Sequence, residues 1–159
     1  MGCVDCPFET VPESVASAFE ELVLDNPAKV RRKEGNCLPR YIIEFGLGLD
    51  FHGQDVTKAA AKAVRDAISK SCLCGLSEIL HLDDLSQGIA VHVTVAVSRP
   101  QEVDLQKVAE ELPVGAITIT PVTGGLNVPG LYLQRFGDKD DSIEAALACV
   151  EVTIAENAA

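Results

Sequence analysis

The fold of this chain follows from one stretch, RYIIEFGLGLDFHGQDVTKAAAKAVRDAIS, residues 40–69. Its first residues are β-branched or aromatic, which is typical of a strand, and the two glycines that follow predict a strand end near residues 45–47. Over residues 56–68, small apolar side chains recur every three or four positions, so we expect a helix with a narrow apolar stripe. Asp55 is a favourable N-cap because its carboxylate can accept from free amides of the first turn.

The rest of the chain alternates strands and helices. The clearest strand is the IAVHVTVAV run, in which Ile or Val alternates with small or polar residues. Pro121 has no amide hydrogen to donate to a strand ladder, so we expect it at the end of a strand or at the edge of the sheet. The expected elements are strands over 89–97, 115–122 and 131–136, a helix over 103–112, an ambiguous segment over 76–82, and a tail in which a short helix from Asp141 through Leu147 runs into a final strand up to Ile154.

These elements predict an α/β (α+β) fold, a two-layer sandwich with one mixed or mostly antiparallel sheet and two main helices on one face. At 159 residues the chain suits one domain. We expect a compact unit over residues 40–159, preceded by an extension over residues 1–39 that holds a helix near 12–24 and a linker. Helices on one face leave the other sheet face apolar and uncovered, so we predict a homo-oligomer.

Charge and composition exclude several kinds of partner. The net charge of −11 repels phosphate backbones, so nucleic acid is not expected. No stretch of about 18 apolar residues occurs and the first residues lack a secretory pattern, so we expect no membrane span and a cytoplasmic location, or a plastid in a plant or alga. Without export the six cysteines are expected to be reduced, and Cys3 and Cys6 alone are too few for a closed zinc site.

The segment GLGLDFHG, residues 46–53, is the strongest candidate for a functional site. It is not a dinucleotide fingerprint, since the third glycine of that pattern would fall on Phe51. We interpret it as a polar pocket in which Asp50 orients His52, the two being candidate catalytic residues for acid/base work. The alternative is that both side chains only satisfy amides in a tight turn. The candidate ligand-binding residues of this segment are Gly46, Gly48 and Gly53, which let a backbone approach a ligand.

Two other loops are expected at the same edge of the sheet. Ser98 and Arg99 follow the clearest strand, and Thr123, Gly124 and Gly125 follow the next one. Arginine suits a carboxylate or imide oxygen, and two glycine amides can form an oxyanion-type nest. We therefore include these five residues as candidate ligand-binding residues, although the glycines suit an ordinary turn equally well.

His92 is a weaker candidate. A single histidine within a strand is more often a packing residue, but with Asp50 and His52 it could hold a cation. We assign no metal ligands, and the sequence does not identify a cofactor.

The signature GxGxDxHG, read in residues 46–53, resembles that of a small family of conserved hypothetical proteins, the Lin family. The later segments GQDVTKAAAKAVRDAI, VHVTVAV, ELPVGAITI and TGGL resemble the same family, so the similarity spans residues 40–154. Residues 1–39 resemble only its variable prefix. The family has no established activity, so the resemblance implies the fold and little of the chemistry.

A more distant resemblance is to one repeat unit of cyanuric acid hydrolase and barbiturase. Those enzymes join three units around a pseudo-threefold axis and open cyclic amides with Ser–Lys dyads. The resemblance implies a homotrimer, or a multiple of three, with sites between subunits. The dyad itself is not reproduced, because Ser98 stands where the lysine is expected and Thr123 where the serine is expected.

From the sequence we expect a homo-oligomer that binds a small polar molecule at the GxGxDxHG segment, with cyclic-amide-like hydrolysis as one chemistry open to it. The alternative is a non-catalytic assembly or metal-binding protein.

Overall fold

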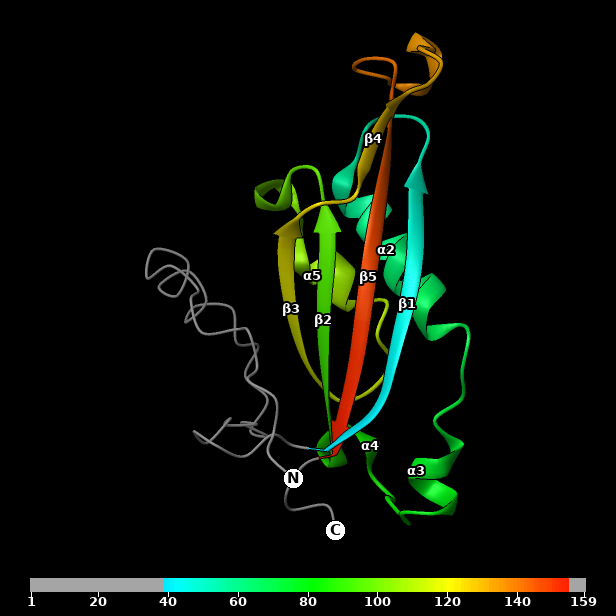
Figure 1. Ribbon diagram of the computed structural model, residues 1–159, viewed down its shortest axis with the longest axis vertical. Helices are drawn as coiled ribbons and strands as arrows, with labels where there is room; N and C mark the ends of the chain where they lie inside the picture. The colour runs from blue at the N-terminus through cyan, green and yellow to red at the C-terminus, as the bar shows by residue number, and fades with distance from the viewer. Residues whose placement is uncertain (1–38, 155–159) are drawn as a thin grey trace, which may run out of the picture.

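The computed structural model describes residues 39–154, which form one layer of strands and one layer of helices (Figure 1). The elements in chain order are β1 (Arg40–Asp50), α2 (Val56–Ile68), α3 (Cys74–Glu78), α4 (Leu85–Gly88), β2 (Ile89–Val97), η1 (Pro100–Glu102), α5 (Leu105–Ala109), β3 (Ala116–Thr123), β4 (Leu126–Pro129), η2 (Gln134–Phe136) and β5 (Ser142–Ile154).

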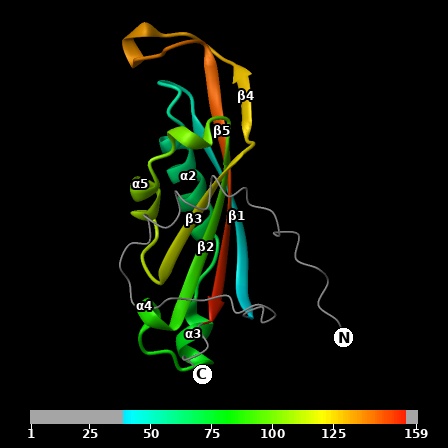
Figure 2. The ribbon, with the colours of Figure 1, turned by 90° about the vertical axis from the view of Figure 1, so that its left-hand side faces the viewer.

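The five strands form one mixed sheet in the order β1-β5-β2-β3. The long strand β5 is antiparallel to both of its neighbours, while β2 and β3 are parallel and are connected through η1 and α5. The short strand β4 pairs with the first residues of β5, beyond the end of β2. Helices α2 and α5 lie on the same face of the sheet (Figures 1 and 2). The predicted fold class is therefore confirmed, and Pro121 lies in the edge strand.

Helix α2 packs against β1 with its backbone close to the strand. The alanines of its apolar stripe are fully buried, and Gly46 and Gly48 lie directly beneath them. A Cβ atom on Gly48 would lie 2.0 Å from the carbonyl oxygen of Ala59, and one on Gly46 would lie 2.0 Å from that of Ala63. Glycine is tolerated inside a strand where another backbone approaches this closely. The prediction that the strand ends near residues 45–47 was therefore wrong, since β1 continues to Asp50.

The hydrophobic core lies between this helix layer and the sheet. The residues of β2 predicted to face inward, from Ile89 to Val97, are all buried. Asp55 caps α2 as predicted, because its carboxylate accepts from the amides of Thr57 and Lys58. No helix among residues 39–154 is long and apolar enough to cross a membrane.

The C-terminal part of the described chain differs from its prediction. The expected helix through Leu147 is instead the first half of β5, because pairing with β1 on one side and with β4 and β2 on the other outweighs the helix propensity of Glu and Ala. The expected strand over 131–136 contains η2, which lies beyond the pairing of β4 with β5 and ends at Gly137 in the left-handed region. Strand β4 was not predicted from the sequence. The helix expected near residues 12–24 lies outside the described residues.

Candidate functional site

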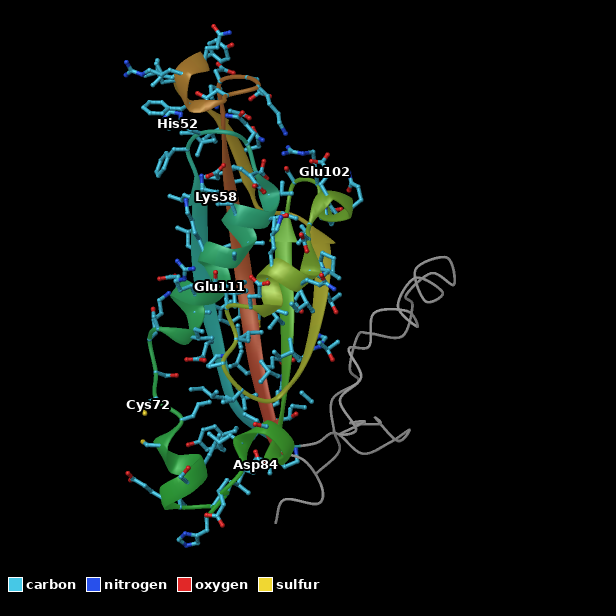
Figure 3. The ribbon with its side chains drawn as sticks, turned by 180° about the vertical axis from the view of Figure 1, so that it is seen from behind. His52, Lys58, Cys72, Asp84, Glu102 and Glu111 are labelled. Carbon is cyan, nitrogen blue, oxygen red and sulfur yellow. The ribbon has the colours of Figure 1, made fainter. Side chains whose placement is uncertain are left out.

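The predicted site segments meet at one end of the sheet. Strands β1, β2 and β3 all run toward this end, so the loops that follow them gather there (Figure 1). These loops carry His52, Arg99 and Gly124, respectively. Strand β4 runs in the same direction, so the loop between β4 and β5, residues 130–141, lies at the same end (Figure 1). Figure 3 shows His52 and Lys58 at this end, while Cys72 and Asp84 lie at the opposite end.

His52 is hydrogen bonded to a carboxylate that the sequence analysis did not identify. Its Nδ1 lies 3.0 Å from Oδ2 and 3.2 Å from Oδ1 of Asp138, in the loop before β5. The Asp138 carboxylate is buried and also accepts from the amides of Leu133, at 2.7 Å, and Gly53, at 2.9 Å. The structure thus pairs the imidazole with Asp138, in place of the expected partner Asp50.

These hydrogen bonds decide the charge of Asp138. Burial on its own would raise the pKa of the carboxyl, but the hydrogen bonds from Leu133, His52 and Gly53 outweigh burial and lower the pKa below its usual value. Asp138 is therefore ionised at neutral pH and can only accept. It follows that the neutral imidazole carries its proton on Nδ1 and that Nε2 is the basic nitrogen.

The imidazole also packs against an aromatic ring. The ring centroids of His52 and Phe136 are 4.8 Å apart, and the guanidinium carbon of Arg135 lies 5.1 Å from the centre of the Phe136 ring. The His52 side chain retains 35% of its exposure, so it remains within reach of a molecule from solvent. A partly exposed imidazole that packs against an aromatic ring and is held by an ionised carboxylate has the geometry of a general base.

Asp50 has a different role. Its carboxylate is fully buried, and Oδ2 accepts from the amide of Asp55 at 3.0 Å, which holds the end of β1 to the start of α2. Among the described residues Oδ1 accepts no hydrogen bond of regular geometry, and its charge is balanced by Nζ of Lys58 at 2.7 Å and of Lys62 at 3.7 Å. Asp50 therefore organises the α2 terminus and two lysines.

A second buried carboxylate, Glu144, lies opposite Asp50 in the pairing of β1 with β5. It accepts from the amide of Ser98 at 3.2 Å, from Nη1 of Arg99 at 3.3 Å and from Nδ2 of Asn127 at 3.1 Å. Glu144 thus joins the end of β2 to β4 through one side chain.

Arg99 is held by several groups at once. Its Nε donates to Glu102 at 3.0 Å and its Nη2 to the carbonyl of Gln54 at 2.8 Å. The hydrogen bond to Glu102 is the main reason that the pKa of Arg99 is raised, with further contributions from the charges of Glu102 and Glu144. The guanidinium therefore cross-links the loops after β1 and β2, and a ligand would have to share it.

The candidate glycines fall into two groups. Gly46 and Gly48 are covered by α2, so they shape the fold and do not face a ligand. Gly53 has a φ of +92° and donates its amide to Asp138, so it belongs to the His52 loop. Gly125, with a φ of +74°, makes the turn into β4, where a Cβ would lie 2.3 Å from the Ala145 carbonyl oxygen.

The remaining candidates lie at the ends of β2 and β3. Gly124 donates its amide to the carbonyl of Val97 at 2.9 Å, which continues the parallel pairing of β3 with β2, so this amide is not available to a ligand. Thr123 is exposed at the end of β3. The hydroxyl of Ser98 accepts from Nη1 of Arg99 at 3.2 Å.

Gln54 is a further residue of the site, and no sequence pattern indicates it. It is buried with a φ of 51°, its Nε2 donates to the Ser142 carbonyl, and its Oε1 accepts from the Lys139 amide. It thus fastens the His52 loop to the segment that carries Asp138. Among the residues that were missed, Glu144 carries a sequence signal, because it is a charged residue directly before the apolar run AALACV.

The expected grouping of Asp50, His52 and His92 for a cation is not present. His92 lies in the middle of β2, opposite Glu151 and Thr118. In residues 39–154, no three His, Cys, Asp or Glu side chains come together in a way that could hold a metal ion.

Fold and site together define a one-sided α/β sandwich with a polar cluster at the ends of three of its strands. The chain belongs to a family of conserved hypothetical proteins, Lin0512_fam, whose model matches residues 40–152. Its fold is similar to that of an FtsZ-like protein of unknown function from Nostoc punctiforme, with 38% identity and a TM-score of 0.69 over 77% of this chain and all of that one. None of the curated proteins compared with the chain matches it.

Proposed function

We propose that this protein binds a small polar molecule at the end of the sheet and that His52 and Asp138 act on it as an acid/base pair. The observation that carries the proposal is the 3.0 Å contact between the buried Asp138 carboxylate and Nδ1 of the partly exposed His52. This contact directs the lone pair of the neutral imidazole to Nε2, where a proton of a ligand or of a water molecule can be taken up.

The same geometry supplies the charge balance of such a step. When Nε2 takes a proton, the imidazolium is stabilised by the ionised Asp138, 3.0 Å from the other nitrogen. Hydrolysis of a cyclic amide by an activated water is one reaction that this pair could serve. A serine nucleophile activated by lysine does not form part of the proposal, because Ser98 and Thr123 stand where the lysine and the serine of that dyad are expected.

The second candidate is a non-catalytic assembly protein. It is favoured by the way in which Asp138 and Gln54 bind backbone groups on both sides of the His52 loop. In that case the hydrogen bond between His52 and Asp138 only holds two loops together, and no ligand binds at Nε2.

Homo-oligomerisation is the other part of the proposal and is common to both candidates. It is supported by the large apolar side chains that remain exposed on the sheet face opposite the helices.

A ligand screen with matched histidine variants separates the two candidates. Cyclic imides, ureides and small carboxylates are tested by ligand-observed NMR against the wild type, His52→Gln and His81→Asn. His81 is the control because it is exposed and follows α3, away from the loops of the candidate site. We expect at least one compound whose binding is lost in His52→Gln and kept in His81→Asn. Hits that bind all three proteins equally would support the assembly candidate.

A further inference from the structure

The sheet face opposite the helices carries a continuous apolar surface. Leu47 of β1 lies opposite Leu147 of β5, and Phe45 lies opposite Cys149. Leu126 of β4 lies opposite Ala145, on the other side of β5. Residues that lie opposite one another in an antiparallel pair project to the same face. Phe45, Leu47, Leu126 and Leu147 are therefore neighbours on one surface, which we name the open-face patch, and each keeps at least half of its exposure, with 65% for Phe45.

The patch contains no charged side chain. The first charge on this face of β5 is Glu151, which forms an ion pair with Arg40 at 3.0 Å near the start of β1. A chain with a net charge of −11 repels its own copies over most of its surface, so an uncharged area is where two copies can approach most closely.

The size of the patch also suits a protein partner. Its large side chains expose on the order of 400 Å², which is within the range of about 300–600 Å² for the largest apolar patch on a monomer, a kind of patch that is often functional. A standard interface buries about 800 Å² on each partner, so the patch would supply most of an apolar interface centre.

The neighbouring edge of the sheet is closed to a partner strand. Along the outer edge of β1, the Leu47 amide donates to Asp66 at 2.8 Å. The Phe45 carbonyl accepts from Lys70 at 2.9 Å, and the Leu49 carbonyl accepts from Lys62 at 2.6 Å. Lys62 and Asp66 belong to α2, and Lys70 follows its C-terminal end. Backbone groups that are already hydrogen bonded in this way cannot pair with another chain. A second copy therefore cannot extend the sheet by pairing a strand with β1.

We infer that a second copy of this chain covers the open-face patch, with Phe45, Leu47 and Leu147 at the centre of the contact. This inference rests on the proposed homo-oligomer and gives it a location. All residues of the open-face patch lie within residues 40–152, the part of the chain that matches the family model. Each copy can therefore form the contact with this part of its chain. Contact through the sheet faces also leaves the hydrogen bonds along the outer edge of β1 intact.

The native mass of matched variants tests this location. The full chain, a Phe45→Thr/Leu147→Thr double variant and Ile79→Gln are compared by size-exclusion chromatography with light scattering over a range of concentrations. Ile79 is the control because it is exposed and follows α3, away from the sheet face. We expect an oligomer for the wild type and Ile79→Gln, and a dissociation constant at least tenfold higher for the double variant.

The failures of the two proposals are distinguishable. An oligomer that the double variant leaves unchanged overturns the open-face contact while the homo-oligomer stands, and directs attention to the outer edge of β3. A wild type that is monomeric at every concentration overturns both.

Cys149 provides a measurement that needs no variant. It lies opposite Phe45 on the patch, whereas Cys72 is exposed near α3 at the other end of the molecule (Figure 3). Burial already raises the pKa of the Cys149 thiol, with a further contribution from Glu151, so its rate is compared only with itself. We expect alkylation of Cys149 to become at least tenfold faster when the oligomer is diluted to the monomer, with Cys72 unchanged. An equal rate at both concentrations contradicts the contact, and protection of Cys149 in a monomer shows that another part of the same chain covers the patch.

Discussion

Replacing Gly48 by alanine tests whether the glycines of the GxGxDxHG segment shape the fold. The added Cβ would lie 2.0 Å from the Ala59 carbonyl oxygen and 2.4 Å from the Ala63 amide nitrogen. Both are backbone atoms of α2, so no side-chain rotation relieves the contact and the helix must move outward by roughly 1 Å or more to restore van der Waals distances. This movement disrupts the packing of fully buried alanines against the sheet.

The expected cost is about 2 kcal/mol, because overpacking against backbone atoms costs about 3 kcal/mol and the gain of up to about 1 kcal/mol from a stiffer unfolded chain offsets part of it. The midpoint of thermal unfolding should fall by about 7 °C. The matched control is Gly137→Ala, where φ is +82° and no atom lies within 4 Å of the added Cβ. Only the left-handed backbone opposes that change, at about 1 kcal/mol.

Thermal unfolding followed by far-UV circular dichroism, with urea titration for the free energy, measures both variants. The reasoning is refuted if Gly48→Ala unfolds within about 2 °C of the wild type, or if Gly137→Ala is the more destabilised of the two. Either result would mean that α2 does not lie against β1 as described.

Three further predictions concern single side chains. Glu144→Ala removes the common acceptor of Ser98, Arg99 and Asn127 and should cost about 3 kcal/mol in urea titration, whereas Glu144→Gln should cost less. Because the folded-state pKa of Asp138 is lowered, its contribution to stability is present above the unfolded pKa of about 3.9 and is lost as pH falls through the folded value. The stability difference between the wild type and Asp138→Asn should therefore shrink below about pH 4; a difference that grows there contradicts the assigned contacts. Asp55→Ala removes the cap of α2 and should cost about 1 kcal/mol, with Asp55→Asn nearly neutral in the same titration.

Much of the fold could be predicted because several elements have one buried and one open face. The alternation in β2 and the apolar stripe of α2 follow directly from such burial, and so does the assignment of a sheet with helices on one face. Strand β5 could not be predicted in the same way. Its first half, from Ser142, contains residues that favour a helix, and its conformation depends on neighbours that are distant in sequence.

The glycines of β1 were misleading for a related reason. Read locally, Gly46 and Gly48 indicate freedom of the backbone and the end of a strand. In the folded chain they are required by the approach of α2, which follows only after the strand and helix have been placed together. A small residue in a strand can thus report on packing as well as on flexibility.

The location of the candidate site was predicted better than the residues that form it. Strands that run in one direction bring their following loops to one end, which is why His52 and Arg99 share an end of the sheet. The carboxylate partner of His52 was not predictable from spacing, since Asp138 is 86 residues away and lies in an acidic loop that reads as solvent-exposed. Asp50, two positions from His52, points to the α2 terminus instead.

The central claim, that Asp138 leaves Nε2 of His52 as a base, is tested most directly by the protonation state of the imidazole. Long-range ¹⁵N–¹H NMR of the histidine rings in the full chain, at a pH where His52 is neutral, distinguishes its two tautomers. The structure predicts a proton on Nδ1 in the wild type and loss of this preference in Asp138→Asn. A proton on Nε2 of the wild-type imidazole would contradict the assignment of His52 as a base.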